Sequence, residues 1–118
     1  MSAHGNKMRI FVSPHAVRAY QKRVKYLSPG AAEVEIAGAL RAPVFRAASA
    51  DGRLTLWGCY NRAGFPIVVA TDLADECAEF LLVRTCGPFW FWHECRREWE
   101  RIRGHRARRR SHDRLPDP

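Results

Sequence analysis

The chain begins with segments in which apolar and polar residues recur at helical spacing. Ser13-Pro14 is a typical helix start, a hydroxyl N-cap followed by proline, and predicts a helix as far as about Leu27. At about 100° per residue, its apolar and basic side chains fall on two separate arcs. The apolar arc holds Val17, Tyr20, Val24 and Leu27, and the basic arc holds His15, Arg18, Lys22 and Lys25.

A second helix and then a run of strands follow. Ser28-Pro29 repeats the helix-start signal and predicts a helix over about 30–41, which Ala42-Pro43 ends. From Val44 the pattern changes to short apolar runs separated by turn signals, which predicts four strands in an antiparallel meander. The predicted strands are 44–47, 53–60, 65–71 and 80–85, and residues 8–12 are either a strand or an extended segment packed on the core.

The last third of the chain predicts one more helix and a tail. Gly87-Pro88 is expected to end the sheet, and a helix is expected from Phe89 to about Arg103. Its Trp92, Cys95, Trp99 and Ile102 have helical spacing and should pack back on the sheet. We therefore expect an α+β fold with two N-terminal helices, a four-stranded antiparallel sheet and a C-terminal helix with a basic tail. Residues 8–103 would form a single domain, and residues 104–118 a flexible Arg-rich tail.

The charge of the chain is high and unevenly placed. The 118 residues include 20 Lys and Arg against 12 Asp and Glu, which gives +8. Residues 1–95 hold eleven basic and eight acidic groups, whereas residues 96–118 hold nine Arg and four acidic groups. Seventeen of the cations are Arg, the side chain whose planar fork suits phosphate and stacks on bases. This balance favours a polyanionic partner, although an acidic protein surface would also fit.

No targeting or membrane segment is expected. The first residues lack the apolar run of a signal peptide, and no stretch is long and apolar enough to cross a membrane. Four cysteines without a secretion signal are most simply free thiols in a reducing, cytoplasmic compartment. Their spacings of seventeen, eight and eight residues contain no close pair, so we expect neither a structural metal nor any cofactor.

The Arg-rich segment is the first candidate for function. Its guanidinium groups could neutralise phosphates without reading sequence, and Arg-rich segments also fold on RNA. A solvated surface face is the alternative. The predicted nucleic-acid-binding residues are Arg96, Arg97, Arg101, Arg103, Arg106, Arg108, Arg109 and Arg110.

The first helix and the aromatic run are the other candidates. A neutral His15 near Arg18, Lys22 and Arg23 could act as general base or acid on a ribose hydroxyl while the cations steady the charge on phosphorus. The alternative is a helix-start histidine on an ordinary exposed basic face. In the run 89–92, one or two rings should be exposed, with Trp90 and Trp92 suited either to base stacking or to a protein contact.

Two short motifs carry a family resemblance. The first is Ser13-Pro14-His15-Ala16-Val17 with Arg23-Val24, and the second is Phe80–Thr85. Together they resemble the RelE/BrnT-like toxin superfamily and related small prophage proteins. The resemblance covers about 9–86 and implies a metal-free endoribonuclease. Members of this superfamily carry Arg one helical turn after the His, but this chain has Ala19 there and Arg18 one position earlier. This departure also fits a scaffold that is reused for binding and no longer catalyses cleavage. The implied catalytic set is His15, Arg18, Lys22, Arg23, Arg84 and Thr85.

Two hypotheses of different class follow. In the first, a small phage- or mobile-element-type protein binds RNA, in preference to DNA, and is toxin-like if it cleaves. In the second, it is a non-catalytic inhibitor that binds a host polymerase, nuclease or defence complex, with the aromatic patch and basic tail as contact surface. Under the first hypothesis an antitoxin would be a further partner. Neither hypothesis involves a membrane.

Overall fold

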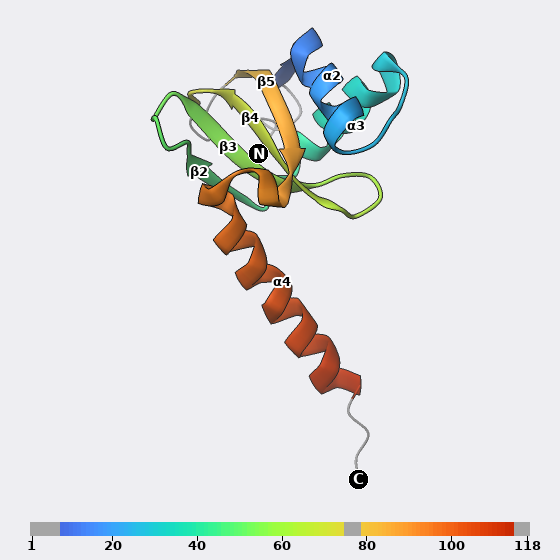
Figure 1. The fold of residues 1–118 in the computed structure, drawn as a ribbon, viewed down its shortest axis with the longest axis vertical. Helices are drawn as coiled ribbons and strands as arrows, with labels where there is room; N and C mark the ends of the chain where they lie inside the picture. The colour runs from blue at the N-terminus through green and yellow to red at the C-terminus, as the bar shows by residue number, and fades with distance from the viewer. Residues whose placement is uncertain (1–7, 75–78, 115–118) are drawn as a thin grey trace.

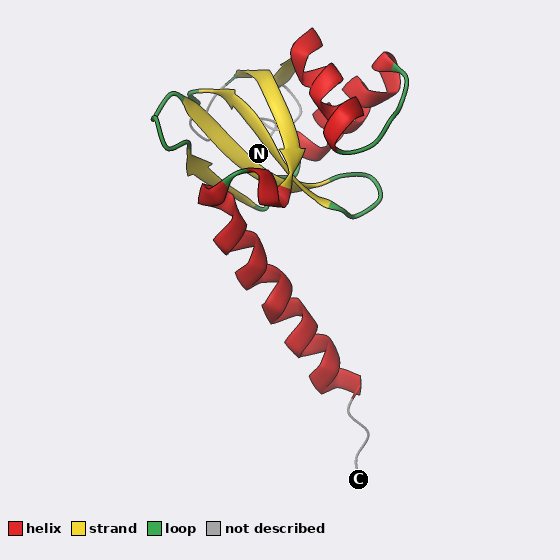
Figure 2. Ribbon diagram, in the orientation of Figure 1, coloured by secondary structure: helices red, strands yellow, loops and turns green. Residues whose placement is uncertain are grey.

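The structure, a computed structural model, describes residues 8–74 and 79–114, with side chains as far as Gly104. It is an α+β fold in which helices α2 and α3 cover one face of a twisted sheet and the start of helix α4 covers part of the other (Figure 1). Figure 2 shows the rest of α4 projecting away from the sheet. The α+β class predicted from the sequence is therefore confirmed.

The sheet has five strands and is mixed, which corrects the prediction of four antiparallel strands. Its order is β1-β5-β4-β3-β2. The strands are β1 (Arg9–Val12), β2 (Phe45–Ala48), β3 (Leu54–Tyr60), β4 (Pro66–Asp72) and β5 (Phe80–Pro88). Strands β2 to β5 form the expected meander, but β1 pairs in parallel with β5, from Arg9 opposite Phe80 to Val12 opposite Val83. No turn joins β1 to β5, so no local sequence signal marks this pairing.

The two N-terminal helices begin where the Ser-Pro pairs predict. Helix α2 (Pro14–Arg23) is capped by Ser13, whose hydroxyl accepts from the Ala16 N–H at 3.1 Å. Helix α3 (Pro29–Leu40) is capped in the same way by Ser28. The predicted end of the first helix at Leu27 is wrong. The helix ends at Arg23, because the Tyr20 carbonyl accepts from both the Val24 and the Lys25 N–H groups, and the regular ladder stops there. The Leu27 carbonyl accepts from the Gln21 side chain at 2.7 Å.

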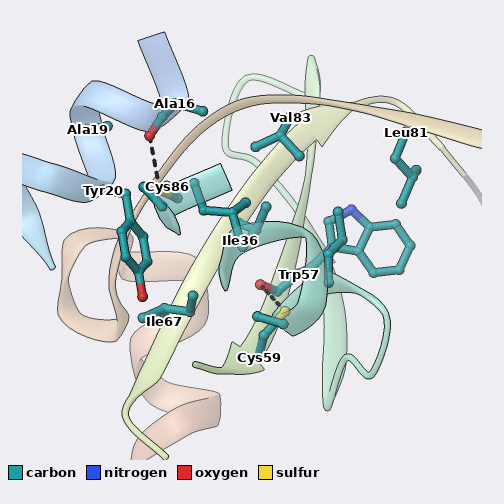
Figure 3. Close-up of a cluster of buried hydrophobic side chains, with 14 residues drawn as sticks. Ala16, Ala19, Tyr20, Ile36, Trp57, Cys59, Ile67, Leu81, Val83 and Cys86 are labelled. Carbon is teal, nitrogen blue, oxygen red and sulfur yellow. Dashed lines mark hydrogen bonds between the residues drawn. The ribbon is translucent and has the colours of Figure 1, made fainter. Parts of the chain in front are cut away.

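The main core lies between α2, α3 and the sheet. Figure 3 shows side chains of α2 and α3 meeting those of β3, β4 and β5, with Tyr20, Ile36 and Val83 among those that are fully buried. The Tyr20 hydroxyl donates to Glu35 on α3 at 2.5 Å and accepts from the Asn61 amide at 3.3 Å. Because Asn61 lies in the turn between β3 and β4, this network ties both helices to one end of the sheet.

The C-terminal segment covers the second face, but its elements differ from the prediction. Strand β5 continues to Pro88, because a proline without an N–H is tolerated where β1 no longer pairs with β5. Residues Phe89–Phe91 form the 3-10 helix η1, and α4 spans His93–Arg114 rather than ending near Arg103. As predicted, α4 packs back on the sheet, with Cys95 and Trp99 buried and Trp92 and Ile102 partly buried. The expected flexibility of residues 115–118 lies outside the described residues.

In the described part of the chain, no helix combines the length and the apolar character that crossing a membrane requires.

Candidate nucleic-acid interface

Arg23, the last residue of α2, joins that helix to the C-terminal segment. One guanidinium nitrogen donates to the Thr85 hydroxyl and to the Cys86 carbonyl, each at 3.2 Å. The guanidinium carbon also lies 4.2 Å from the centre of the Phe91 ring, within the range of a cation–π contact. All these partners are neutral, so the positive charge of Arg23 is positioned without being cancelled.

The turn between β3 and β4 adds a cation that the sequence analysis did not single out. The Asn61 side chain accepts from the Ala63 and Phe65 N–H groups at 3.0 and 2.8 Å, and Gly64 supplies the positive φ of 83° that the turn requires. Arg62 is exposed on this turn and forms no ion pair with any described residue. The Asn-x-x-Gly signal predicts the turn, but only the fold brings it beside α2 and η1.

Two aromatic rings of η1 are exposed next to these cations. Trp90 is 53% exposed and Phe91 is 47% exposed, while Phe89 is buried. Trp90 contacts Phe65 of the same β3–β4 turn, with ring centres 5.8 Å apart. Trp92, predicted to be a second contact residue, is partly buried and packs against the second core, which lies between the sheet and the start of α4.

The elements that carry these residues meet where α2 ends, at the end of the sheet nearest the β3–β4 turn (Figure 1). We call it the basic-aromatic surface and define it as Lys22, Arg23, Arg62, Trp90 and Phe91. Arg18 lies one helical turn before Lys22, and both are exposed without an ion pair to any described carboxylate. Lys25, by contrast, pairs with Glu35 at 3.6 Å and is part of the fold.

Arg84 lies in a β-bulge of β5 and is already paired. Ala70 pairs with Thr85 but Thr71 with Val83, so Arg84 is the extra residue. Its guanidinium forms a two-point contact with the Asp72 carboxylate, at 2.7 and 3.4 Å. The ion pair raises the pKa of Arg84 and leaves Arg84 with a neutralised charge.

Four of the six predicted catalytic residues lie on α2, which packs along β5, where Arg84 and Thr85 lie. At the start of α2 the Ser13 hydroxyl donates to the Arg84 carbonyl at 3.2 Å. Among the described side chains, Arg23 and Thr85 are the one pair of the six in hydrogen-bond contact. His15 is exposed on the first turn of α2, without a hydrogen bond to another member of the set. A general base needs an aligned partner and a pocket for the reacting phosphate. The arrangement offers cations and rings for binding more clearly than an assembled catalytic centre.

The described half of α4 offers less positive charge than its sequence suggests. Arg96 pairs with Glu100 at 3.6 Å, and Arg101 pairs with Glu98. Arg103 lies 4.7 Å from the centre of the Phe89 ring. Arg97 is exposed without an ion pair among the described residues. The predicted contacts at Arg106, Arg108, Arg109 and Arg110 concern side chains outside the described ones, although their backbone belongs to α4.

The described cysteines are buried thiols. Burial raises the pKa of Cys59, Cys86 and Cys95 to about 12, so they stay protonated at neutral pH. Cys59 and Cys86 donate weak hydrogen bonds to backbone carbonyls at 3.6 Å (Figure 3). No group of three potential metal ligands occurs among the residues that the structure describes, and Cys77 lies outside them.

An open hollow of about 670 Å³ lies elsewhere, beside the Arg84–Asp72 pair. It is lined by 72–74 and 79–82, in which the charged groups are the carboxylates of Asp72 and Glu79. No cation lines the hollow among the described residues, so the hollow does not extend the basic-aromatic surface.

No protein-family model matches this chain, and no curated protein or solved structure matches it at a significant level. The resemblance to RelE/BrnT-like toxins, which depends on short motifs, therefore stays a prediction.

Proposed function

We propose that this chain binds RNA through the basic-aromatic surface. The observation that carries the proposal is the position of Arg23, held on β5 and 4.2 Å from the centre of the Phe91 ring. This contact joins the cations of α2 to the exposed rings of η1. Cations beside exposed aromatic rings are the combination that proteins use to bind nucleic-acid backbones and bases together.

The charges on this surface support a polyanionic partner. Lys22, Arg23 and Arg62 have no ion pair among the described residues, whereas Arg84, Arg96 and Arg101 are each paired with a carboxylate. Unpaired cations can release counterions from a phosphate backbone, which is the main source of non-specific nucleic-acid affinity. The sequence from Arg106 to Arg114 adds five further Arg to the positive charge of the chain. RNA is favoured over DNA because RNA more often presents the unpaired bases that exposed rings can contact.

The test is charge reversal at two residues that take no part in the core. We expect Lys22→Glu/Arg62→Glu to weaken binding of a labelled RNA oligonucleotide, measured by fluorescence anisotropy at several salt concentrations. Losing two phosphate contacts should reduce the slope of log affinity against log salt by about 1.4.

The matched control is Arg9→Glu/Arg53→Glu, which changes the net charge equally at exposed positions outside this surface. It should bind RNA more tightly than the first variant does. Equal losses in the two variants would show that total charge alone controls affinity, and would overturn the proposed site. If the wild-type protein binds no RNA but co-purifies from its host with one stoichiometric protein, the inhibitor hypothesis replaces this proposal.

A further inference from the structure

We infer that the basic-aromatic surface selects single-stranded RNA, because a base must leave its stack to lie against the Trp90 ring. This inference rests on the proposed RNA binding and names the substrate class of the same site. It concerns the Trp90 ring, whereas the test of the proposed function changes two cations.

Trp90 is the ring best placed to accept a base. Its two aromatic neighbours, Phe65 and Phe89, lie at interplanar angles of 82° and 80° to it. Neither neighbour therefore covers an indole face by parallel stacking, and the residue is 53% exposed. The exposed part of the indole is therefore available to a planar base.

Phe91 is less suited to this role, although it is almost as exposed. The Arg23 guanidinium lies over its ring, and Trp92 packs against it with ring centres 4.7 Å apart. A Cβ on Gly87 would come within 3.3 Å of the same ring, so Phe91 also lies close to the β5 backbone. Phe91 is therefore occupied by contacts within the protein, whereas Trp90 has no cation over its ring among the described residues.

The Trp90 ring is also held in place before any ligand arrives. Phe89 on one side is buried in the second core, and Phe65 on the other packs against the main core. The turn that carries Phe65 is fixed by the side chain and backbone of Asn61. A ring fixed in this way loses little conformational entropy on binding, which increases the share of stacking energy that appears as affinity.

A double helix cannot use such a ring in the same way. Its bases are stacked on one another and its outer surface presents phosphates, so a duplex would contact Lys22, Arg23 and Arg62 but not the indole face. Stacking of one base on an aromatic side chain contributes roughly 5- to 150-fold in affinity. Duplex RNA should lack this contribution.

The experiment compares one single-stranded RNA with the same RNA annealed to its complement, using the full chain and its variants. We expect the wild type to prefer the single strand. Trp90→Ala should lose roughly 5- to 150-fold on the single strand and little on the duplex. Trp90→Phe, which keeps an aromatic face, should retain most of the preference. Phe80→Ala, which removes a ring that is 59% exposed on a distant part of the sheet, should bind as the wild type does.

The outcomes separate this inference from the proposed function. If Trp90→Ala binds both RNAs as the wild type does while Lys22→Glu/Arg62→Glu weakens both, the single-strand inference is wrong and RNA binding stands. If the wild type binds neither RNA, both fail. Loss of a co-purifying protein in Trp90→Ala, with RNA binding unchanged, would assign Trp90 to a protein contact and overturn the inference. Circular dichroism and thermal unfolding of each variant check that it is folded.

Discussion

The guanidinium carbon of Arg23 lies 4.2 Å from the centre of the Phe91 ring, and this contact connects α2 with the segment that follows the sheet. The same guanidinium binds Thr85 and the Cys86 carbonyl on β5. It thus reaches β5 beyond Val83, the last residue that pairs with β1. Arg23, which the sequence suggests for catalysis, therefore connects α2 with β5 and η1.

Removal of this anchor should reduce stability as well as RNA affinity. We expect Arg23→Ala to lower the free energy of unfolding by about 1–3 kcal/mol, since two hydrogen bonds and a cation–π contact are lost. Arg23→Lys should keep much of the RNA affinity but not the stability, because an ammonium group cannot reproduce the planar fork. Urea unfolding and anisotropy measure the two effects. If both variants unfold at the wild-type urea concentration, Arg23 does not anchor the segment.

His15 separates binding from catalysis. If the chain binds RNA as proposed, the wild type should not cleave RNA without a metal, and His15→Ala should bind RNA unchanged because His15 lies outside the basic-aromatic surface. Arg18→Glu/Lys22→Glu should instead weaken RNA binding. Gel analysis of host RNA in the presence of a chelator tests this. Strong cleavage by the wild type that falls roughly 10²–10⁴-fold in His15→Ala would instead establish the endoribonuclease.

The Arg residues beyond Arg103 should add affinity but not selectivity. Removing residues 104–118 deletes five Arg, so the salt dependence of RNA binding should become shallower. The preference for single-stranded over duplex RNA should remain, since Trp90 is retained. Anisotropy across a salt series measures both quantities. The same affinity and the same salt slope in truncated and full-length proteins would contradict the prediction.

Two glycines should respond to alanine in opposite directions. A Cβ on Gly58 would overlap the Phe45 ring, which packs against Trp99 with ring centres 5.2 Å apart, so Gly58→Ala should destabilise the fold by about 1–3 kcal/mol. Gly38 lies within α3 with no atom near its Cβ position, so Gly38→Ala should stabilise by about 0.5–1 kcal/mol. Thermal and urea unfolding of both variants check the signs. A neutral Gly58→Ala would show that the Phe45 ring can move aside at no cost.

Buried thiols should make the protein less stable at alkaline pH. The pKa of Cys86 is about 12 in the folded chain and about 9 when exposed, so the unfolded chain loses its proton first. Stability is therefore fully present below pH 9 and falls as the pH rises from 9 towards 12, by about 1.4 kcal/mol per pH unit for each such thiol. Cys86→Ala should show a shallower fall than the wild type in urea unfolding across this range. Equal slopes for both proteins would contradict burial of the Cys86 thiol.

The sequence by itself determined the local elements of this protein. Ser13-Pro14 and Ser28-Pro29 fix the starts of two helices because capping and the proline φ angle act within a few residues. The strands of the meander follow from short apolar runs and from turn residues such as Gly64. The burial of Trp99 on the sheet follows from helical spacing alone.

Only the tertiary structure decided which distant residues meet. The pairing of β1 with β5 and the contacts of Arg23 join positions far apart in the chain, and no local propensity encodes such contacts. Charge counting could not tell the paired Arg96 and Arg101 from Arg62, which has no ion pair among the described residues, because an ion pair depends on the position of its carboxylate. The candidate site therefore moved from Arg-rich α4 towards the end of α2, where the fold leaves cations unpaired beside an open indole ring.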